Sequence, residues 1–164
     1  MAYSNSARAG GVMGSYTTTL QKAAAAVGAV FLLIGILGFI PGITTDYDTM
    51  TFAGHESEAA LLGIFNVSIL HNIVHLAFGV AGVLMARSWN GARVYLIGGG
   101  VIYLLLFIYG LLIDPDSSAN FIPVNNADNW LHLVLAIGMI GLGVALSRGN
   151  NALATGGTAP PSTR

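Results

Sequence analysis

The chain has 164 residues, of which 54% are hydrophobic and only 8% are charged. Soluble domains carry about a quarter of charged residues, so this composition excludes an ordinary soluble fold and predicts a small integral membrane protein. The net charge of −1, without any basic cluster, excludes nucleic acid as a partner. Because the chain has no cysteine, disulfides, thiolate metal sites and iron–sulfur clusters are also excluded.

Four apolar runs follow one another along the chain, each long enough for a helix that crosses about 30 Å of hydrocarbon. They predict an all-α protein, a bundle of four transmembrane helices within one domain over residues 21–148. The Gly, Ser and Thr-rich ends predict a flexible tail over 1–20 and a disordered tail over 149–164. The predicted spans cover about 22–43, 59–86, 92–113 and 129–147.

Basic and acidic residues separate completely when the chain is drawn with four passes. The basic residues all fall on the side of the two termini: Arg8, Lys22, Arg87, Arg93, Arg148 and Arg164. The acidic residues all fall in the two loops on the other side: Asp46, Asp48, Glu56, Glu58, Asp114, Asp116 and Asp128. The positive-inside rule therefore predicts a multi-pass protein of the cell inner membrane with both termini in the cytoplasm.

The second run contains the segment Leu-His-Asn-Ile-Val-His-Leu, which places His71 and His75 one helical turn apart on one face. Imidazoles are costly in lipid, so we expect both to point into the bundle. His71 precedes Arg87 by 16 residues, and His132 precedes Arg148 by 16, which predicts equal depth for His71 and His132. The predicted polar cluster comprises Asn66, Ser68, His71, Asn72, His75, Asp128 and His132.

Three hypotheses account for this cluster. The first is a buried hydrogen-bond network that fixes how the helices pack. The second is a metal site, in which His71, His75 and His132 bind zinc or copper with Asp128 or water as the fourth ligand. Haem is less favoured, because no Arg or Lys lies near to meet its propionates. The third is a route for protons or a small solute along the imidazoles.

A metalloprotease is disfavoured, because the segment His-Asn-Ile-Val-His has Asn72 where a zinc peptidase needs a glutamate as general base. An amide cannot take a proton from water. The two glycine-rich runs, in the first and third spans, are typical of closely packed transmembrane helices.

Two groups of residues also carry a family resemblance over about residues 20–148. The stretch Gly63 to Gly82 and the Asp-Asn-Trp-Leu-His at the start of the last run resemble a bacterial membrane family known as domain of unknown function 4383. The resemblance implies four helices and no assigned activity. Its motifs correspond to Gly63, Phe65, Val67, His71, Asn72, His75, Gly79, Asp128 and His132.

The sequence therefore predicts a small membrane protein that is a non-enzymatic structural or interaction subunit with a buried histidine and asparagine cluster. Its expected partners are the lipid bilayer and a membrane protein complex or further copies of the chain. The alternative is a redox or metal-dependent membrane protein that uses the histidines as ligands, with a metal ion as the only cofactor suggested. A further alternative is a proton-coupled carrier of a small solute.

Overall fold

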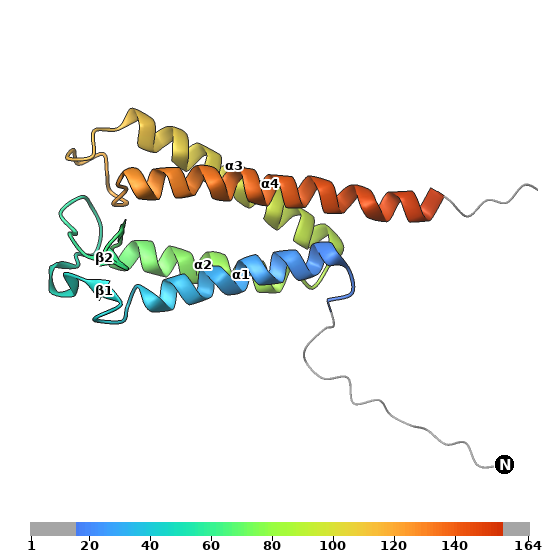
Figure 1. The fold of residues 1–164 in the computed structure, drawn as a ribbon, viewed down its shortest axis with the longest axis horizontal. Helices are drawn as coiled ribbons and strands as arrows, with labels where there is room; N and C mark the ends of the chain where they lie inside the picture. The colour runs from blue at the N-terminus through green and yellow to red at the C-terminus, as the bar shows by residue number, and fades with distance from the viewer. Residues whose placement is uncertain (1–15, 156–164) are drawn as a thin grey trace, which may run out of the picture.

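The computed structural model describes residues 16–155, with side chains up to residue 148. Four helices run up and down along one axis, so that both ends of the described chain lie at the same end of the bundle (Figure 1). Two loops, 38–68 and 113–125, gather at the opposite end, and we call them the head. The helices are α1 (Thr19–Leu37), α2 (Ile69–Met85), α3 (Trp89–Leu112) and α4 (Asn126–Thr155).

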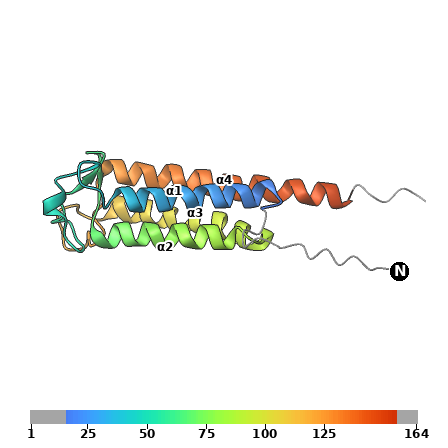
Figure 2. The same ribbon diagram turned by 90° about the horizontal axis from the view of Figure 1, so that it is seen from below.

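The bundle consists of two closely packed helix pairs, α1 with α2 and α3 with α4, which contact one another less extensively. Figure 2 shows α1 and α2 side by side over most of their lengths. Glycines permit this approach: a Cβ added to Gly28 would lie 2.8 Å from the backbone nitrogen of Val83 and 2.9 Å from the carbonyl oxygen of Gly79. The glycine-rich runs therefore serve packing, as small residues do in membrane helices.

Three helical segments are long and apolar enough to cross a membrane: α1, α3 and the part of α4 from Asn126 to Arg148. The helix α2 is apolar but shorter. Large apolar side chains such as Val134 and Leu105 face outward and are more than half exposed, whereas Phe31, Tyr103 and Met139 are buried between the helices. An apolar exterior of this kind is typical of helices that are surrounded by lipid.

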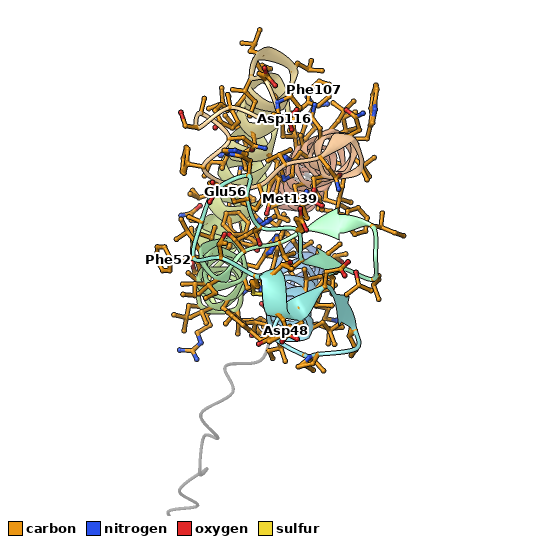
Figure 3. The ribbon with its side chains drawn as sticks, turned by 90° about the vertical axis from the view of Figure 1, so that its left-hand side faces the viewer. Asp48, Phe52, Glu56, Phe107, Asp116 and Met139 are labelled. Atoms are coloured by element: carbon orange, nitrogen blue, oxygen red, sulfur yellow. The ribbon has the colours of Figure 1, made fainter. Side chains whose placement is uncertain are left out.

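The head has its own small core and sheet. Three short antiparallel strands pair in the order β1 (Thr44–Thr45), β2 (Ala60–Leu61) and β3 (Phe65–Asn66), and a 3-10 helix, η1 (Tyr47–Thr49), follows β1. Ala59, Leu61 and Val67 are buried against Ile34 and Leu37 of α1. Figure 3 shows the head end-on, with its sheet over the ends of the helices.

The second span was predicted to cover 59–86, and this is wrong in its first part, because the helix begins only at Ile69. The side chain of Ser68 caps the helix by accepting a hydrogen bond from the backbone nitrogen of His71. The apolar residues before it belong to β2, β3 and the core of the head. Periodicity cannot tell a short buried strand from a helix, which explains the error.

The other boundaries differ by a few residues. The first span was predicted to end at 43, but α1 ends at Leu37, and Gly38 is its C-cap. The third begins before 92, because the side chain of Ser88 caps α3. The fourth begins before 129, and α4 continues to Thr155 through the first part of the segment 149–164 that was predicted to be disordered. The rest of that tail, and residues 1–15 of the predicted N-terminal tail, lie outside the described residues.

The described charges lie at opposite ends of the bundle. The acidic residues lie in the head or at the start of α4: Asp46, Asp48, Glu56, Glu58, Asp114, Asp116 and Asp128. The basic residues lie at the other end: Lys22 in the first turn of α1, Arg87 between α2 and α3, and Arg93 and Arg148, which line one hollow. Arg8 and Arg164 lie outside the described residues.

Candidate functional site

One cavity beneath the head contains the titratable side chains that the sequence singles out. Its volume is about 130 Å³, and His71, His75, Asp128 and His132 all line it. The histidines come from α2 and α4, which belong to different helix pairs. The rest of the wall is apolar and comes from α1, the head and α4: Val30, Phe31, Ile34, Leu61, Leu62, Phe65, Val67, Leu131 and Leu135.

His71 is held by the head. Its Nδ1 lies 3.1 Å from the carbonyl oxygen of Asn66, and its side chain is only 6% exposed. A carbonyl oxygen can only accept, so Nδ1 carries the proton and donates to it. In the neutral imidazole the other nitrogen, Nε2, then keeps its lone pair and is a hydrogen-bond acceptor. The contact with β3 therefore fixes both the orientation and the tautomer of His71.

Asp128 has a structural task at the first turn of α4. Its Oδ2 accepts hydrogen bonds from the backbone nitrogens of Asn66, at 3.0 Å, and of Asn125, at 3.1 Å. In return the backbone nitrogen of Asp128 donates to Oδ1 of Asn125 at 2.9 Å. Such a reciprocal pair is a capping box, with aspartate in the place of the usual glutamate. The carboxylate thus closes the start of α4 and joins it to the head.

His75 and His132 have no such support. Neither Nδ1 has a hydrogen-bond partner among the described residues, although both atoms are buried, and the side chain of His132 is 6% exposed. Buried polar atoms normally have partners, so these two imidazoles need an explanation. The predicted cluster therefore divides into two parts: a hydrogen-bonded part around Asp128 and His71, and two imidazoles on the cavity wall without protein partners.

Aromatic rings connect the histidines across all four helices. The ring of His71 stacks on that of His75 with centroids 4.5 Å apart, and His75 stacks on Phe31 of α1 at 5.6 Å. Phe31 in turn stacks on Tyr103 of α3 at 5.4 Å, and the ring of Tyr103 lies 5.4 Å from that of His132. Packing therefore helps to hold all three imidazoles in position, and His71 has a hydrogen bond in addition.

The three other predicted residues of the cluster do not line the cavity. Ser68 is the N-cap of α2, where its side chain accepts from the backbone nitrogen of His71. Asn72 is fully buried against α1, where a Cβ on Gly38 would meet its amide, and its Nδ2 lies 3.9 Å from Sδ of Met50. Asn66 belongs to β3, and its side-chain oxygen accepts from Nδ2 of Asn125 at 3.1 Å.

A comparison with protein families gives one match, to the family described as domain of unknown function (DUF4383), over residues 21–145. The chain belongs to this family. No significant match was found among the curated proteins or among the solved structures.

The family match includes the helices, the head and all four histidine and aspartate residues of the cavity. Within residues 16–155, however, no three His, Cys, Asp or Glu side chains are arranged as ligands of one metal ion. The hydrogen bonds of Asp128 give this residue a structural role that does not depend on a metal. The hydrogen bonds and the small cavity thus describe the cluster as it lies in the structure, and a metal site at these residues stays a prediction.

The sequence analysis missed three residues that build the site: Phe31, Tyr103 and Asn125. Asn125 stands three residues before Asp128, which is the spacing of a capping box, so this signal was present in the sequence. Phe31 and Tyr103 are aromatic residues in apolar runs. Their place beside the histidines depends on how α1 and α3 pack, and no local pattern shows it.

Proposed function

We propose that this protein is a four-pass protein of the inner membrane, with both termini in the cytoplasm, that serves as a non-enzymatic interaction subunit. Its head lies outside the membrane and contacts a partner protein. The acidic and basic residues occupy opposite ends of the bundle. This separation supports the orientation, because basic residues are retained on the cytoplasmic side.

The observation that carries the proposal is the fastening of the head to the helices. The carboxylate of Asp128 accepts from Asn66 in one loop and from Asn125 in the other. Nδ2 of Asn125 donates to the carbonyl oxygen of Ile64 at 2.8 Å, and the backbone nitrogen of Gly54 donates to the carbonyl oxygen of Phe121 at 2.7 Å. Two loops that need only connect helices are thus joined into one ordered surface, as a docking surface requires.

Two phenylalanines give this surface its apolar character. Phe52 is 63% exposed and Phe121 is 52% exposed, and both lie next to the hydrogen bond between the loops. In Figure 3 Phe52 projects from the edge of the head, and Glu56 and Asp116 lie on the same end of the molecule. Exposed aromatic side chains on a polar surface favour protein contact.

The charge of the head limits the kind of protein surface that can bind to it. All the described charged residues of the head are Asp or Glu, so a second head would meet it with like charge. We therefore propose a membrane protein whose outer surface combines basic and apolar residues. Contact between copies of this chain is the other outcome that the experiment below distinguishes.

Photocrosslinking in intact cells tests the proposal. Benzoylphenylalanine is placed at Phe52 in the head or, as a control, at Leu105, which is 60% exposed on α3. We expect one dominant adduct from position 52 that is absent from position 105. Loss of this adduct in the double variant Phe52→Ser, Phe121→Ser, with the probe moved to Glu56, would locate the contact at the two phenylalanines.

The mass of the adduct separates the outcomes. An adduct with a different protein supports the subunit role, and an adduct at twice the mass of the chain replaces it with a homo-oligomer. If neither position 52 nor position 56 gives an adduct in cells that produce the protein from its own locus, the interaction role is wrong.

A further inference from the structure

We propose that the histidine cavity and a groove between α1 and α4 form one binding site for a membrane lipid that has a single apolar chain and an uncharged, hydroxyl-bearing head group. The lipid enters sideways from the bilayer. This inference goes beyond the interaction role of the head and does not depend on it.

The groove adjoins the cavity. It has a volume of about 340 Å³ and runs along the seam where α1 and α4 contact one another only slightly. Val30, Phe31 and Leu135 line both the groove and the cavity. The other groove residues are all apolar or small: Ala26, Val27, Val134, Gly138, Met139 and Leu142. Such a wall suits a hydrocarbon chain.

The groove faces the lipid. Val30 is 54% exposed and Val134 is 64% exposed, and both point away from the core of the bundle. Gly138 leaves free space in the wall, since no atom lies within 4 Å of a Cβ built on it. This glycine differs from Gly28 and Gly100, where a Cβ would meet the backbone of the neighbouring helix. Packing therefore explains those two glycines, but it does not explain Gly138.

The size of the cavity limits the head group. Cavities of about 150 Å³ in proteins can hold a molecule of the size of benzene. At about 130 Å³ the histidine cavity accepts a head group that is a single ring or smaller, but not a glycerophosphate. The flat faces of Phe31 and His75, which stack with centroids 5.6 Å apart, provide the kind of wall against which a ring packs.

The chemistry of the cavity wall further limits the head group of the lipid. Among the described residues no lysine or arginine lines the cavity, so an anionic head group would be buried without a counter-ion from them. Oδ2 of Asp128 already accepts two backbone hydrogen bonds, which occupies it in holding the head. An uncharged head group remains.

The tautomer of His71 favours a ligand that can donate a hydrogen bond. Its Nδ1 is occupied by the carbonyl of Asn66, which leaves Nε2 as an acceptor for a molecule in the cavity. Within the described part of the chain the buried Nδ1 atoms of His75 and His132 have no hydrogen-bond partners, so these rings can adopt either tautomer to suit a ligand. A hydroxyl group can donate to Nε2 of His71 and accept from a neighbouring imidazole, whereas an ether or a ketone cannot donate. Long-chain alcohols and hydroquinones with one alkyl chain share this chemistry.

The test uses photolabelling of the full chain in phosphatidylcholine nanodiscs with hexadecanol that carries a diazirine. We expect labelled peptides from α1 and α4, and a loss of labelling of about tenfold in Gly138→Leu, which fills the groove, corresponding to about 1.4 kcal/mol. The matched control is Gly98→Leu on α3, because Gly98 also has nothing within 4 Å of a built Cβ and lines neither hollow. The control should label like the wild type.

Competition with unlabelled compounds identifies the head group of the lipid. Unlabelled hexadecanol and decylhydroquinone, whose ring carries no further substituents and stays close to the size of benzene, are compared with hexadecyl methyl ether, which has the same chain as hexadecanol without a donor. One lost hydrogen bond, worth about 1 kcal/mol, should make the ether about fivefold weaker. Whichever hydroxyl compound competes at the lower concentration tells the alcohol source from the quinol source. Equal labelling of both glycine variants, or an ether that competes as well as the alcohol, would overturn the proposal.

Discussion

Oδ2 of Asp128 lies 3.0 Å from the backbone nitrogen of Asn66, and this contact joins the first turn of α4 to the last strand of the head. Asp128 is 3% exposed and shares its carboxylate with the backbone nitrogen of Asn125. One side chain thus links α4, β3 and the loop between α3 and α4.

Substitution Asp128→Ala should therefore loosen the head. It leaves two backbone N–H groups without an acceptor, and we expect it to lower the free energy of unfolding by about 2 kcal/mol. Thermal unfolding in detergent measures the loss, and faster proteolysis within 38–68 would locate it. Asp116→Ala is the control, because that acid is exposed, and its hydrogen bond to Asp114 uses the backbone nitrogen and not the carboxylate. Equal melting temperatures for the two variants would contradict the fastening role.

The packing of α1 on α2 can be tested at Gly28. Substitution Gly28→Ala places a Cβ within 3.0 Å of backbone atoms of α2, so the two helices must separate, at a cost of about 1 to 3 kcal/mol. The same substitution at Gly138 meets no atom and should cost nothing. Thermal unfolding of both variants in the same detergent makes the comparison. Similar stabilities would mean that α1 and α2 do not pack as closely as described.

The orientation can be tested directly, because the chain has no cysteine of its own. Single cysteines are introduced at Ser118 in the head and at Asn90 at the opposite end, and both positions are exposed. We expect a membrane-impermeant maleimide to label Ser118→Cys in spheroplasts and Asn90→Cys only after the membrane is opened. The reverse pattern would invert the topology, and labelling of both positions in intact spheroplasts would contradict a membrane crossing by α3.

Metal content provides a separate test of the site. Because no three ligand side chains among residues 16–155 are arranged around one point, we expect less than about one-tenth equivalent of zinc or copper after purification without chelators. Mass spectrometry of the metals, beside a visible absorption spectrum, measures this. One equivalent of metal or a haem absorption band, lost in His71→Ala, would establish the histidines as ligands after all.

The sequence by itself determined much of the architecture. Low charge and long apolar runs require helices that satisfy their own backbone hydrogen bonds in lipid, and such runs predicted four helices in the right order. The separation of acidic and basic residues predicted that Arg87 and Arg148 lie at one end and Asp48 and Asp116 at the other, as they do in the structure. These properties follow from composition and local order, which a single chain displays directly.

Only the tertiary structure decided where the second helix starts and what the polar residues do. The apolar stretch before Ile69 suits a helix as well as it suits a buried strand, and the choice depends on pairing with β1 and on burial against Ile34. Similarly, Asp128 and His132 lie one turn apart on α4, yet Asp128 is held by backbone N–H groups and His132 has no described partner for Nδ1. Such differences arise from contacts between segments far apart in the chain, and no local sequence pattern reveals these contacts.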